Sequence, residues 1–378
     1  MPRRVLILSA SSGAGHVRAA QAVEKAYAAR GDCVVEHVDA LDYTSKLFQK
    51  IYNNAYIALV RRAPGLMGLL YDRADQPWRH QSRRLALDRL NTGPMIRLLK
   101  RVQPDLCVAT HFLPAEIIAW LKARRKIRAQ HVIVVTDFDV HAMWLCRTVD
   151  RYCVAIEEAA EYLARIGVPR EIIRVTGIPI DPVFAEPKHR REMRRRHGLD
   201  PDRTTLLVSA GGYGVGPIER LVADLLAVGW PWQIVAIAGK AEQIRERLTE
   251  LARRAAKSCD TARLHVVGFT TEMDEWMAAA DLLVGKAGGL TVSEALARAL
   301  PMALIEPIPG QEERNSDHLL EHGAAIRCNN LPAAAWKIAK LLDDPVRLAR
   351  MSAAARAMAR PQAATEIAAE SLKMLEET

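Results

Sequence analysis

The sequence has no apolar run long enough to cross a membrane as a helix, which excludes an integral membrane protein. None of its hydrophobic stretches approaches the roughly 18 consecutive apolar residues that such a helix needs. Its six cysteines form no Cys-X-X-Cys pair, and a chain of 378 residues needs no disulfides for stability. We therefore expect reduced thiols and a cytoplasmic protein.

Aromatic residues make up only 5% of the chain, and no aromatic RNA-binding motif, helix-turn-helix or zinc finger is present. Yet residues 43–103 hold twelve basic residues against three acidic ones, so that this segment carries the whole net charge of +9. Such a concentration favours an anionic partner over a solvated helix face without one. Because apolar stretches such as GLMGLLY separate the basic residues, we expect that partner to be an anionic membrane surface. The residues expected to contact it are Arg61, Arg62, Arg83 and Arg84.

Short apolar, β-rich runs alternate with helical stretches, which predicts parallel sheets covered by helices on both faces. The predicted strands form a first series at 5–9, 33–38, 106–110, 131–136, 151–156 and 172–176, and a second at 205–210, 233–239, 263–268, 281–285 and 301–306. Between them, the proline-rich and charged stretch 178–202 is typical of a linker that runs into a short, solvated helix. We predict an α/β fold of two Rossmann-like domains that face a central cleft. The predicted domains are 1–184 and 185–360, followed by a C-terminal helix at 361–378.

A glycine-rich loop, SGAGHVRAA, follows the first predicted strand and opens a helix. Gly13 and Gly15 allow a ligand to approach the backbone closely, and a helix N-terminus attracts negative charge. A dinucleotide-binding fingerprint would need a third glycine where Arg18 stands, so an NAD-dependent oxidoreductase is disfavoured. His16 lies between this loop and the helix, at the end of a strand where ligands of such sheets bind. That position favours a catalytic role over a structural one.

Two further glycine-rich loops occur in the second series. Gly211, Gly212 and Gly214 follow its first strand and predict a phosphate-binding turn, although an ordinary connection is the alternative. The third loop, GKAGGLTVSEALARALP at 285–301, leads into a helix whose expected N-cap is Thr291. Glu294 would then complete a capping box, or its carboxylate could accept both hydroxyls of a ribose. The loop alone leaves these two alternatives open.

In combination, these segments resemble a known family of enzymes. GKAGGLTVSEALARALP, followed by IPGQEERNSDHLLEHGAA, is similar to the donor-binding segment of the peptidoglycan N-acetylglucosaminyltransferase. It is more similar still to the monogalactosyldiacylglycerol synthases and the processive diacylglycerol glucosyltransferases. SGAGHVRAA, VTDFDVHAMW and VTGIPIDPVF are similar to this lipid-glycosylating branch, and the resemblance covers most of the chain.

The resemblance implies an inverting GT-B glycosyltransferase that needs no cofactor or metal ion. It would move a hexose, either glucose or galactose, from a UDP-sugar to diacylglycerol and act as a peripheral protein on the inner face of the cell membrane. The alternative is an N-acetylglucosaminyltransferase that acts on a polyprenyl-linked acceptor. A UDP-sugar epimerase shares the fold but would need no patch of basic and apolar residues.

The resemblance also implies roles in the acceptor half. His16 is the expected general base, with a pKa near the working pH. Asp137 is expected to orient it or to replace it, and His141 to make a further polar contact with the acceptor or the sugar. Asp137 and Asp139 mimic the DxD metal motif, but they fall in the half that would not hold the diphosphate.

The donor-half residues follow in the same way. Backbone N–H groups of 211–214 and 288–291 would hold the leaving diphosphate. Phe269 and Thr270 are expected at the uracil, and Glu294 at the ribose. The complete expected set of substrate contacts is Gly13, Gly15, Gly211, Gly212, Gly214, Phe269, Thr270, Gly288, Gly289, Leu290, Thr291, Glu294, Gln311 and Glu312 at the sugar hydroxyls, and Asn315.

Overall fold

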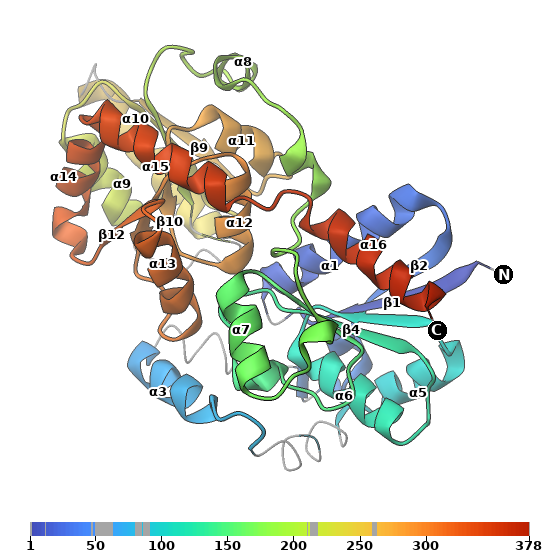
Figure 1. The fold of residues 1–378 in the computed structure, drawn as a ribbon. Coiled ribbons are helices and arrows are strands. Elements are labelled where there is room, and N and C mark those ends of the chain that lie inside the picture. The colour runs from blue at the N-terminus through green and yellow to red at the C-terminus, as the bar shows by residue number, and fades with distance from the viewer. Residues whose placement is uncertain are drawn as a thin grey trace. The chain divides into compact units, whose positions relative to one another are not determined.

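The computed structural model divides the chain into two compact units (Figure 1). The residues it describes are 2–11, 13–46, 48–49, 63–79, 85, 91–209, 211, 218–258 and 263–377. The first unit comprises 1–182, 309–314 and 360–378, and the second comprises 183–308 and 315–359. The first division thus falls after Pro182, where the sequence predicts a boundary after residue 184. The predicted C-terminal helix is part of the first unit.

A six-stranded sheet forms the centre of the first unit, and all its neighbouring strands run parallel. Its order is β2-β1-β3-β4-β5-β6. The strands are β1 (Arg3–Ser9), β2 (Cys33–Asp39), β3 (Leu106–Ala109), β4 (Gln130–Val134), β5 (Arg151–Val154) and β6 (Ile173–Val175). The helices are α1 (Ala14–Arg30), α3 (Pro64–Ala74), α5 (Gly93–Val102), α6 (Phe112–Ala123), α7 (Glu157–Arg165) and α16 (Ala363–Glu376).

Both faces of this sheet are buried at its inner strands, which explains why VLIL in β1 and LCVA in β3 are continuous apolar runs, whereas the edge strand β2 is only partly buried. Val5 and Ile7 point into a core that includes residues of α1 and α16. Leu6 and Leu8 point into the opposite core, which includes residues of α5 and α6. The parallel α/β architecture predicted from the sequence is confirmed.

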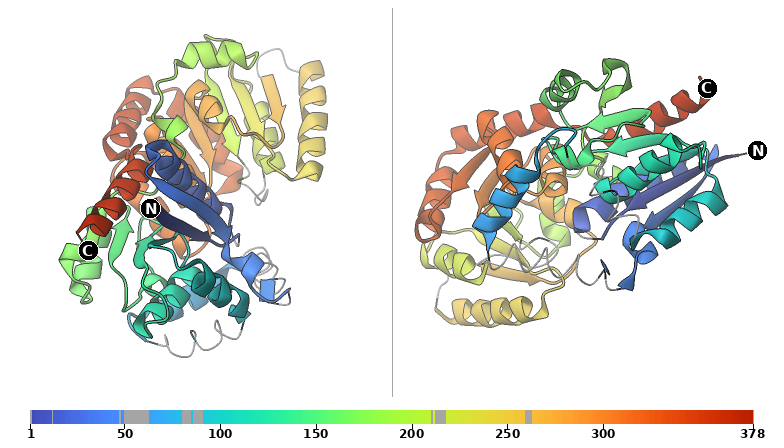
Figure 2. Two further views of the ribbon diagram at one scale, coloured as in Figure 1. Left: turned by 90° about the vertical axis from the view of Figure 1, so that its right-hand side faces the viewer. Right: turned by 90° about the horizontal axis from the view of Figure 1, so that it is seen from below.

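Helix α16 packs against α1, and the two helices lie side by side in Figure 1 and in the left view of Figure 2. Ala364, Ile367 and Ala368 are buried in the same core as Val5. The carboxylate of Glu370 accepts hydrogen bonds from Arg151 at 2.7 Å and from Arg174 at 3.0 Å. The end of the chain thus completes the unit that the start of the chain begins.

The second unit repeats the architecture with the strand order β12-β11-β10-β7-β8-β9. Its strands are β7 (Thr205–Ser209), β8 (Gln233–Ile237), β9 (Arg263–Val267), β10 (Leu282–Gly285), β11 (Met302–Ile305) and β12 (Ala325–Cys328). Its helices are α8 (Arg190–Arg196), α9 (Ile218–Ala227), α10 (Glu242–Ser258), α11 (Met273–Ala279), α12 (Gly289–Ala297), α14 (Leu331–Leu342), α15 (Pro345–Met358) and α13 (Gln311–Glu321), the last from residue 315 on. Strand β12 was not predicted.

The basic helix α8 differs from the solvated helix predicted for the linker. Arg194 is buried, and its guanidinium donates to Asp281 at 2.5 Å and to the carbonyl of Ala279 at 2.9 Å. Arg190 donates to the other oxygen of Asp281 at 2.8 Å. These bonds fix α8 to the start of β10. Among the described residues, no helix is long and apolar enough to span a bilayer.

Candidate active site

The ring of His16 is held at the carboxyl ends of two neighbouring strands of the first sheet. Gly13, in an extended conformation, is the N-cap of α1, and His16 falls in the first turn of that helix. Its Nδ1 lies 2.9 Å from the carbonyl oxygen of Thr110, after β3, and 3.0 Å from the hydroxyl of Thr136, after β4. A carbonyl can only accept a hydrogen bond, so Nδ1 carries the proton. Nε2 therefore carries the lone pair, and it has no hydrogen-bond partner within the described part of the chain.

Burial governs the charge of His16. Its ring lies 4.6 Å from the ring of His111, edge to face, and 6.3 Å from that of Trp144. Loss of hydration lowers the pKa of His16 to about 4, although the hydrogen bond to Thr110 opposes this shift. The expectation of a pKa near the working pH is therefore wrong, because the sequence does not show how deeply the ring is enclosed. His16 is a neutral imidazole at physiological pH.

His111 is a residue of this site that the sequence reasoning missed. It lies two residues after the end of β3, is only 1% exposed, and accepts a hydrogen bond at Nδ1 from the N–H of Leu113, so that it caps α6. Burial and the nearby His16 hold the pKa of His111 well below its usual value. A histidine at the end of a predicted strand was the only available signal.

The two acids of the DFD sequence are each bound to a residue from the segment 309–314. Asp137 is buried, and the side-chain amide of Gln311 lies 2.7 and 2.8 Å from its two carboxylate oxygens. Asp139 accepts a hydrogen bond of 2.6 Å from the guanidinium of Arg314. The structure thus brings together Asp137 and Gln311, which are predicted site residues from distant parts of the sequence.

His141 is engaged by main-chain groups at both ring nitrogens. Nδ1 accepts from the N–H of Met143 at 3.1 Å, and Nε2 donates to the carbonyl of Tyr71 at 3.0 Å. The ring is buried and lies 4.2 Å from the ring of Tyr71. His141 therefore ties α3 to the turn Ala142–Trp144. Its expected contact with substrate would require one of these hydrogen bonds to break.

In the second unit, α12 begins earlier than the sequence suggests. Gly288 is its N-cap and makes no side-chain hydrogen bond, so Thr291 lies within the first turn. The capping box considered for Glu294 is therefore wrong, and this carboxylate, 1% exposed, lies one turn further into the helix. The N–H groups of Gly289, Leu290 and Thr291 precede the first intrahelical hydrogen bond, as at any helix N-terminus.

Asn315 forms a hydrogen bond with the glycine loop that precedes α12. Its side chain is fully buried, and Nδ2 donates to the carbonyl of Ala287 at 3.1 Å. Ala287 directly precedes the N-cap of α12. Asn315, which was expected to contact the donor, thus binds the loop that presents the α12 N-terminus.

The residues expected at the uracil lie after β9. The ring of Phe269 is 64% exposed, with the ammonium of Lys240 5.3 Å from its centre. The hydroxyl of Thr270 accepts from the N–H of Glu272 at 3.0 Å and so forms the turn before α11. An exposed aromatic face beside a glycine-rich sheet edge is a suitable surface for a base to stack upon.

Other predicted residues are only partly described. Gly211, with φ of 68°, follows β7 in the left-handed conformation that glycine adopts readily. Gly212, Gly214 and the four arginines expected at the membrane lie outside the described residues. Within the described ranges, no group of three or more histidine, cysteine or acidic side chains could hold a metal ion.

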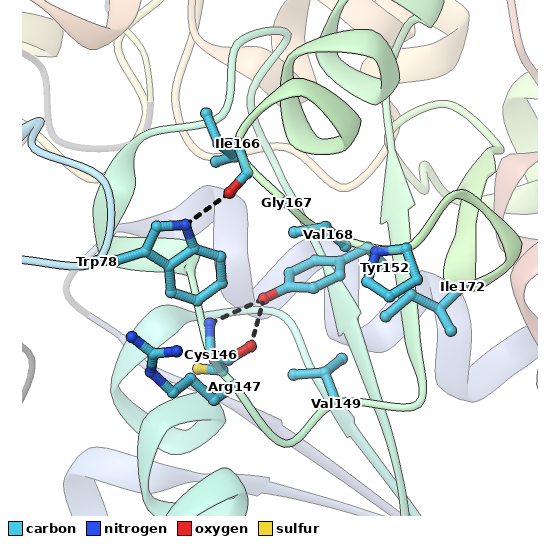
Figure 3. A pocket seen from close by; sticks show the side chains of 10 residues that line it. Trp78, Cys146, Arg147, Val149, Tyr152, Ile166, Gly167, Val168 and Ile172 are labelled. Carbon is cyan, nitrogen blue, oxygen red and sulfur yellow. Dashed lines mark hydrogen bonds between the residues drawn. The ribbon is translucent and has the colours of Figure 1, made fainter.

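A pocket of about 340 Å³ lies elsewhere in the first unit (Figure 3). The indole N–H of Trp78 donates to the carbonyl of Ile166 at 2.8 Å, and the guanidinium of Arg147 lies 5.2 Å from the indole ring centre. The hydroxyl of Tyr152 accepts from the N–H of Cys146 at 2.8 Å. None of the predicted site residues lines this pocket.

Comparison with known proteins identifies related families over most of the chain. Residues 16–180 match the family model described as monogalactosyldiacylglycerol (MGDG) synthase, and residues 219–370 match the glycosyltransferase family 28 C-terminal domain. A processive diacylglycerol beta-glucosyltransferase of Staphylococcus saprophyticus is 29% identical over 382 residues, which cover 99% of this chain and 93% of that protein.

Solved structures show the same fold at lower sequence identity. MurG of Acinetobacter baumannii has a TM-score of 0.67 and 18% identity, covering 98% of this chain and all of that chain. HepE of Anabaena, solved with UDP-glucose, has a TM-score of 0.55 and 16% identity, covering 98% of this chain and 99% of that chain. The chain therefore belongs to the glycosyltransferases that join a monogalactosyldiacylglycerol synthase domain to a family 28 C-terminal domain, and it is a UDP-sugar-dependent enzyme with the GT-B fold.

Proposed function

We propose that this enzyme transfers glucose or galactose from its UDP-sugar to diacylglycerol, with inversion, at the cytoplasmic face of the membrane. The observation that carries the proposal is the ring of His16, which is held at Nδ1 and presents a proton-accepting Nε2. The names of the relatives supply the acceptor, since the most similar of those described above acts on diacylglycerol.

In the proposed reaction, Nε2 of His16 takes the proton of the diacylglycerol hydroxyl as its oxygen attacks the anomeric carbon. The new C–O bond forms while the bond from that carbon to the diphosphate breaks, and UDP leaves with the electron pair. The proton then passes from His16 to water. Because burial keeps His16 neutral, the base is in its active form across the physiological pH range.

Donor binding is proposed for the second unit, together with residues 311 and 312. The α12 N-terminus and the turn at Gly211 would stabilise the charge that develops on the leaving diphosphate. The buried carboxylate of Glu294 is suited to the two ribose hydroxyls, and Phe269 to the uracil. We propose that no metal ion takes part. The engagement of Asp137 by Gln311 and of Asp139 by Arg314 supports this, since both acids already have donors.

Helix α3 supports a membrane location. Leu66, Leu69 and Leu70 lie on one face of this helix at helical spacing, and they are 49%, 48% and 47% exposed. Exposed leucines gathered on one helix face are typical of a surface that contacts lipid or another protein. Together with the basic segment around them in the sequence, they favour an anionic bilayer.

The test is incorporation of radiolabel into lipid. The enzyme is incubated with vesicles that contain both diacylglycerol and a polyprenyl-linked acceptor. Labelled UDP-glucose, UDP-galactose or UDP-N-acetylglucosamine is added, and the products are extracted into organic solvent. We expect one of the two hexoses to label diacylglycerol, with and without EDTA. Label from UDP-N-acetylglucosamine alone, on a polyprenyl-linked acceptor, would overturn the proposal. Loss of activity with EDTA that Mg²⁺ restores would overturn its metal-free part.

A further inference from the structure

Residues 309–314, called the strap below, pack closely against helix α3 within the first unit. A Cβ atom at Gly68 would come within 2.9 Å of the Cβ of Pro309. One at Gly310, whose φ is +86°, would come within 2.6 Å of the Tyr71 ring. Both contacts are too short for a side chain, so glycine is required on each side of this interface.

Arg314 fastens the strap at its other end. Its Nη1 donates to Asp75 at 2.9 Å and to Asp139 at 2.6 Å, and its guanidinium lies 5.3 Å from the ring centre of Tyr71. The second oxygen of Asp75 accepts from the N–H of Ala142 at 2.8 Å. One guanidinium thus joins the end of α3 to the loop that follows β4.

The strap also carries the residues proposed to bind the sugar of the donor. Gln311 lies on it with its amide against Asp137, and Glu312 is the next residue. Helix α3 therefore has two different faces. One face, with Gly68 and Tyr71, contacts the strap, and the opposite face exposes the three leucines proposed to contact lipid.

We propose that Arg314 is a positioning residue that couples lipid contact at α3 to binding of the donor's sugar, an inference that rests on the proposed function. A lipid surface that restricts the motion of α3 also restricts the motion of the strap, because Tyr71 of α3 and Asp75 at the C-terminal end of this helix contact the strap. Gln311 and Glu312 then lose less conformational freedom when the sugar binds, so the sugar binds more tightly. Coupling between two ligands is reciprocal, so the UDP-sugar strengthens lipid binding by the same factor.

Calorimetry with three ligands tests the coupling. UDP-glucose, UDP-galactose and UDP are titrated into the enzyme with and without vesicles of equal parts phosphatidylglycerol and phosphatidylcholine. The vesicles contain no diacylglycerol, so no transfer takes place. We expect the vesicles to tighten binding of the transferred UDP-hexose about fivefold or more, a typical coupling. The affinity for UDP, which lacks the sugar, should be the same with and without vesicles.

Two variants, called the anchor variants below, weaken the ion pair between Arg314 and Asp75 in different ways. Arg314→Met deletes the charge, and Asp75→Asn weakens the ion pair while keeping an oxygen for the N–H of Ala142. In both we expect the vesicle-dependent gain to disappear and UDP affinity to stay unchanged, which also shows that the donor site is folded. The matched control is Arg165→Met, which removes an exposed ion pair with Glu161, 2.7 Å long, from the same unit. Arg165→Met should keep the full vesicle-dependent increase in affinity for the UDP-hexose.

The outcomes separate this inference from the proposed function. Equal gain in wild type and in both anchor variants overturns the coupling through Arg314, as does a wild type that transfers sugar but shows no gain. An enzyme that binds neither UDP-hexose, with or without vesicles, contradicts the proposed function itself. If Arg314→Met fails to bind UDP, the comparison is made with Asp75→Asn alone.

Discussion

At the scale of single residues, the hydrogen bonds of Nδ1 to Thr110 and Thr136 fix the orientation of the His16 ring. Nε2 can therefore act as the proton acceptor. We expect His16→Gln to lower kcat by roughly 10²–10⁴, the usual range for a lost general base. Glutamine can still donate to the carbonyl of Thr110, so UDP affinity should change little. The measurements are kcat and the affinity for UDP by calorimetry, and the control is His322→Gln, an exposed histidine that directly follows α13.

The pH profile of the same enzyme gives a second check on His16. Only its neutral form accepts a proton, and burial lowers its pKa to about 4. The kcat/KM of wild type should therefore stay level from pH 8 down to about pH 5. An acid limb centred near 6.5, or near-normal turnover in His16→Gln, would make Asp137 the leading candidate for the base.

In the donor half, Glu294 is the residue whose role can be tested by a single substitution. The proposed contact of its buried carboxylate with the ribose predicts that Glu294→Gln weakens UDP binding by about 1.5–3 kcal/mol, or roughly 10–100-fold. Calorimetry with UDP measures the loss. Glu246→Gln, on the exposed face of α10, is the control. Unchanged UDP affinity in Glu294→Gln would remove the ribose contact.

The environment of these residues could not be predicted from the sequence. His16 and the glycine loops were found because ligand sites of parallel sheets lie where strands end and helices begin. The low pKa of His16 depends on His111 and Trp144, which approach from other parts of the chain. The bonds between Arg314, Asp75 and Asp139 likewise join residues far apart in sequence, and no local pattern marks them.

At the scale of elements, α3 makes a distinct prediction about lipid binding. Replacing Leu66, Leu69 and Leu70 together by glutamine should lower partition into anionic vesicles by tenfold or more, since each half-exposed leucine that enters lipid contributes on the order of 1 kcal/mol. Co-sedimentation measures the change. The control is Trp336→Gln with Val346→Gln, two exposed apolar residues of the second unit. An equal loss of vesicle partition in the α3 variant and in the control would show that α3 has no specific role in lipid binding.

The elements themselves were largely predictable, for reasons visible in particular cases. VLILS in β1 and LCVA in β3 are apolar runs because helices cover both faces of the first sheet. Strand β12, Ala325–Cys328, was missed because AIRC is short and contains a half-buried arginine. The start of α12 was misplaced because Thr291 fits the usual N-cap pattern, whereas the extended backbone of Gly288 begins the helix.

At the scale of the whole molecule, buried histidines make stability depend on pH. Burial lowers the pKa of both His16 and His131 to about 4 from an unfolded value near 6.5. Between these values the unfolded chain binds protons that the folded chain does not, so stability falls as the pH drops from 6.5 towards 4. Each histidine should account for about 2 kcal/mol of the loss by pH 5.

Urea unfolding at pH 7.5 and pH 5 tests this dependence, followed through the transition that includes the first unit. His131→Gln should reduce the difference between the two pH values, and His322→Gln should not. If wild type and His131→Gln lose equal stability, the buried imidazole of His131 is not a source of the acid sensitivity.

The position of α16 in the first unit has a consequence for how the chain is made. A ribosome adds roughly 5–20 residues per second, so the stretch from residue 183 to the start of α16 takes roughly 10–40 seconds to synthesise. During that time the nascent first unit has all its strands but lacks the helix that buries Ile367 and its neighbours against the sheet. An apolar face is left open to chaperones or to other nascent chains. The half that is translated first is therefore the half that finishes folding last.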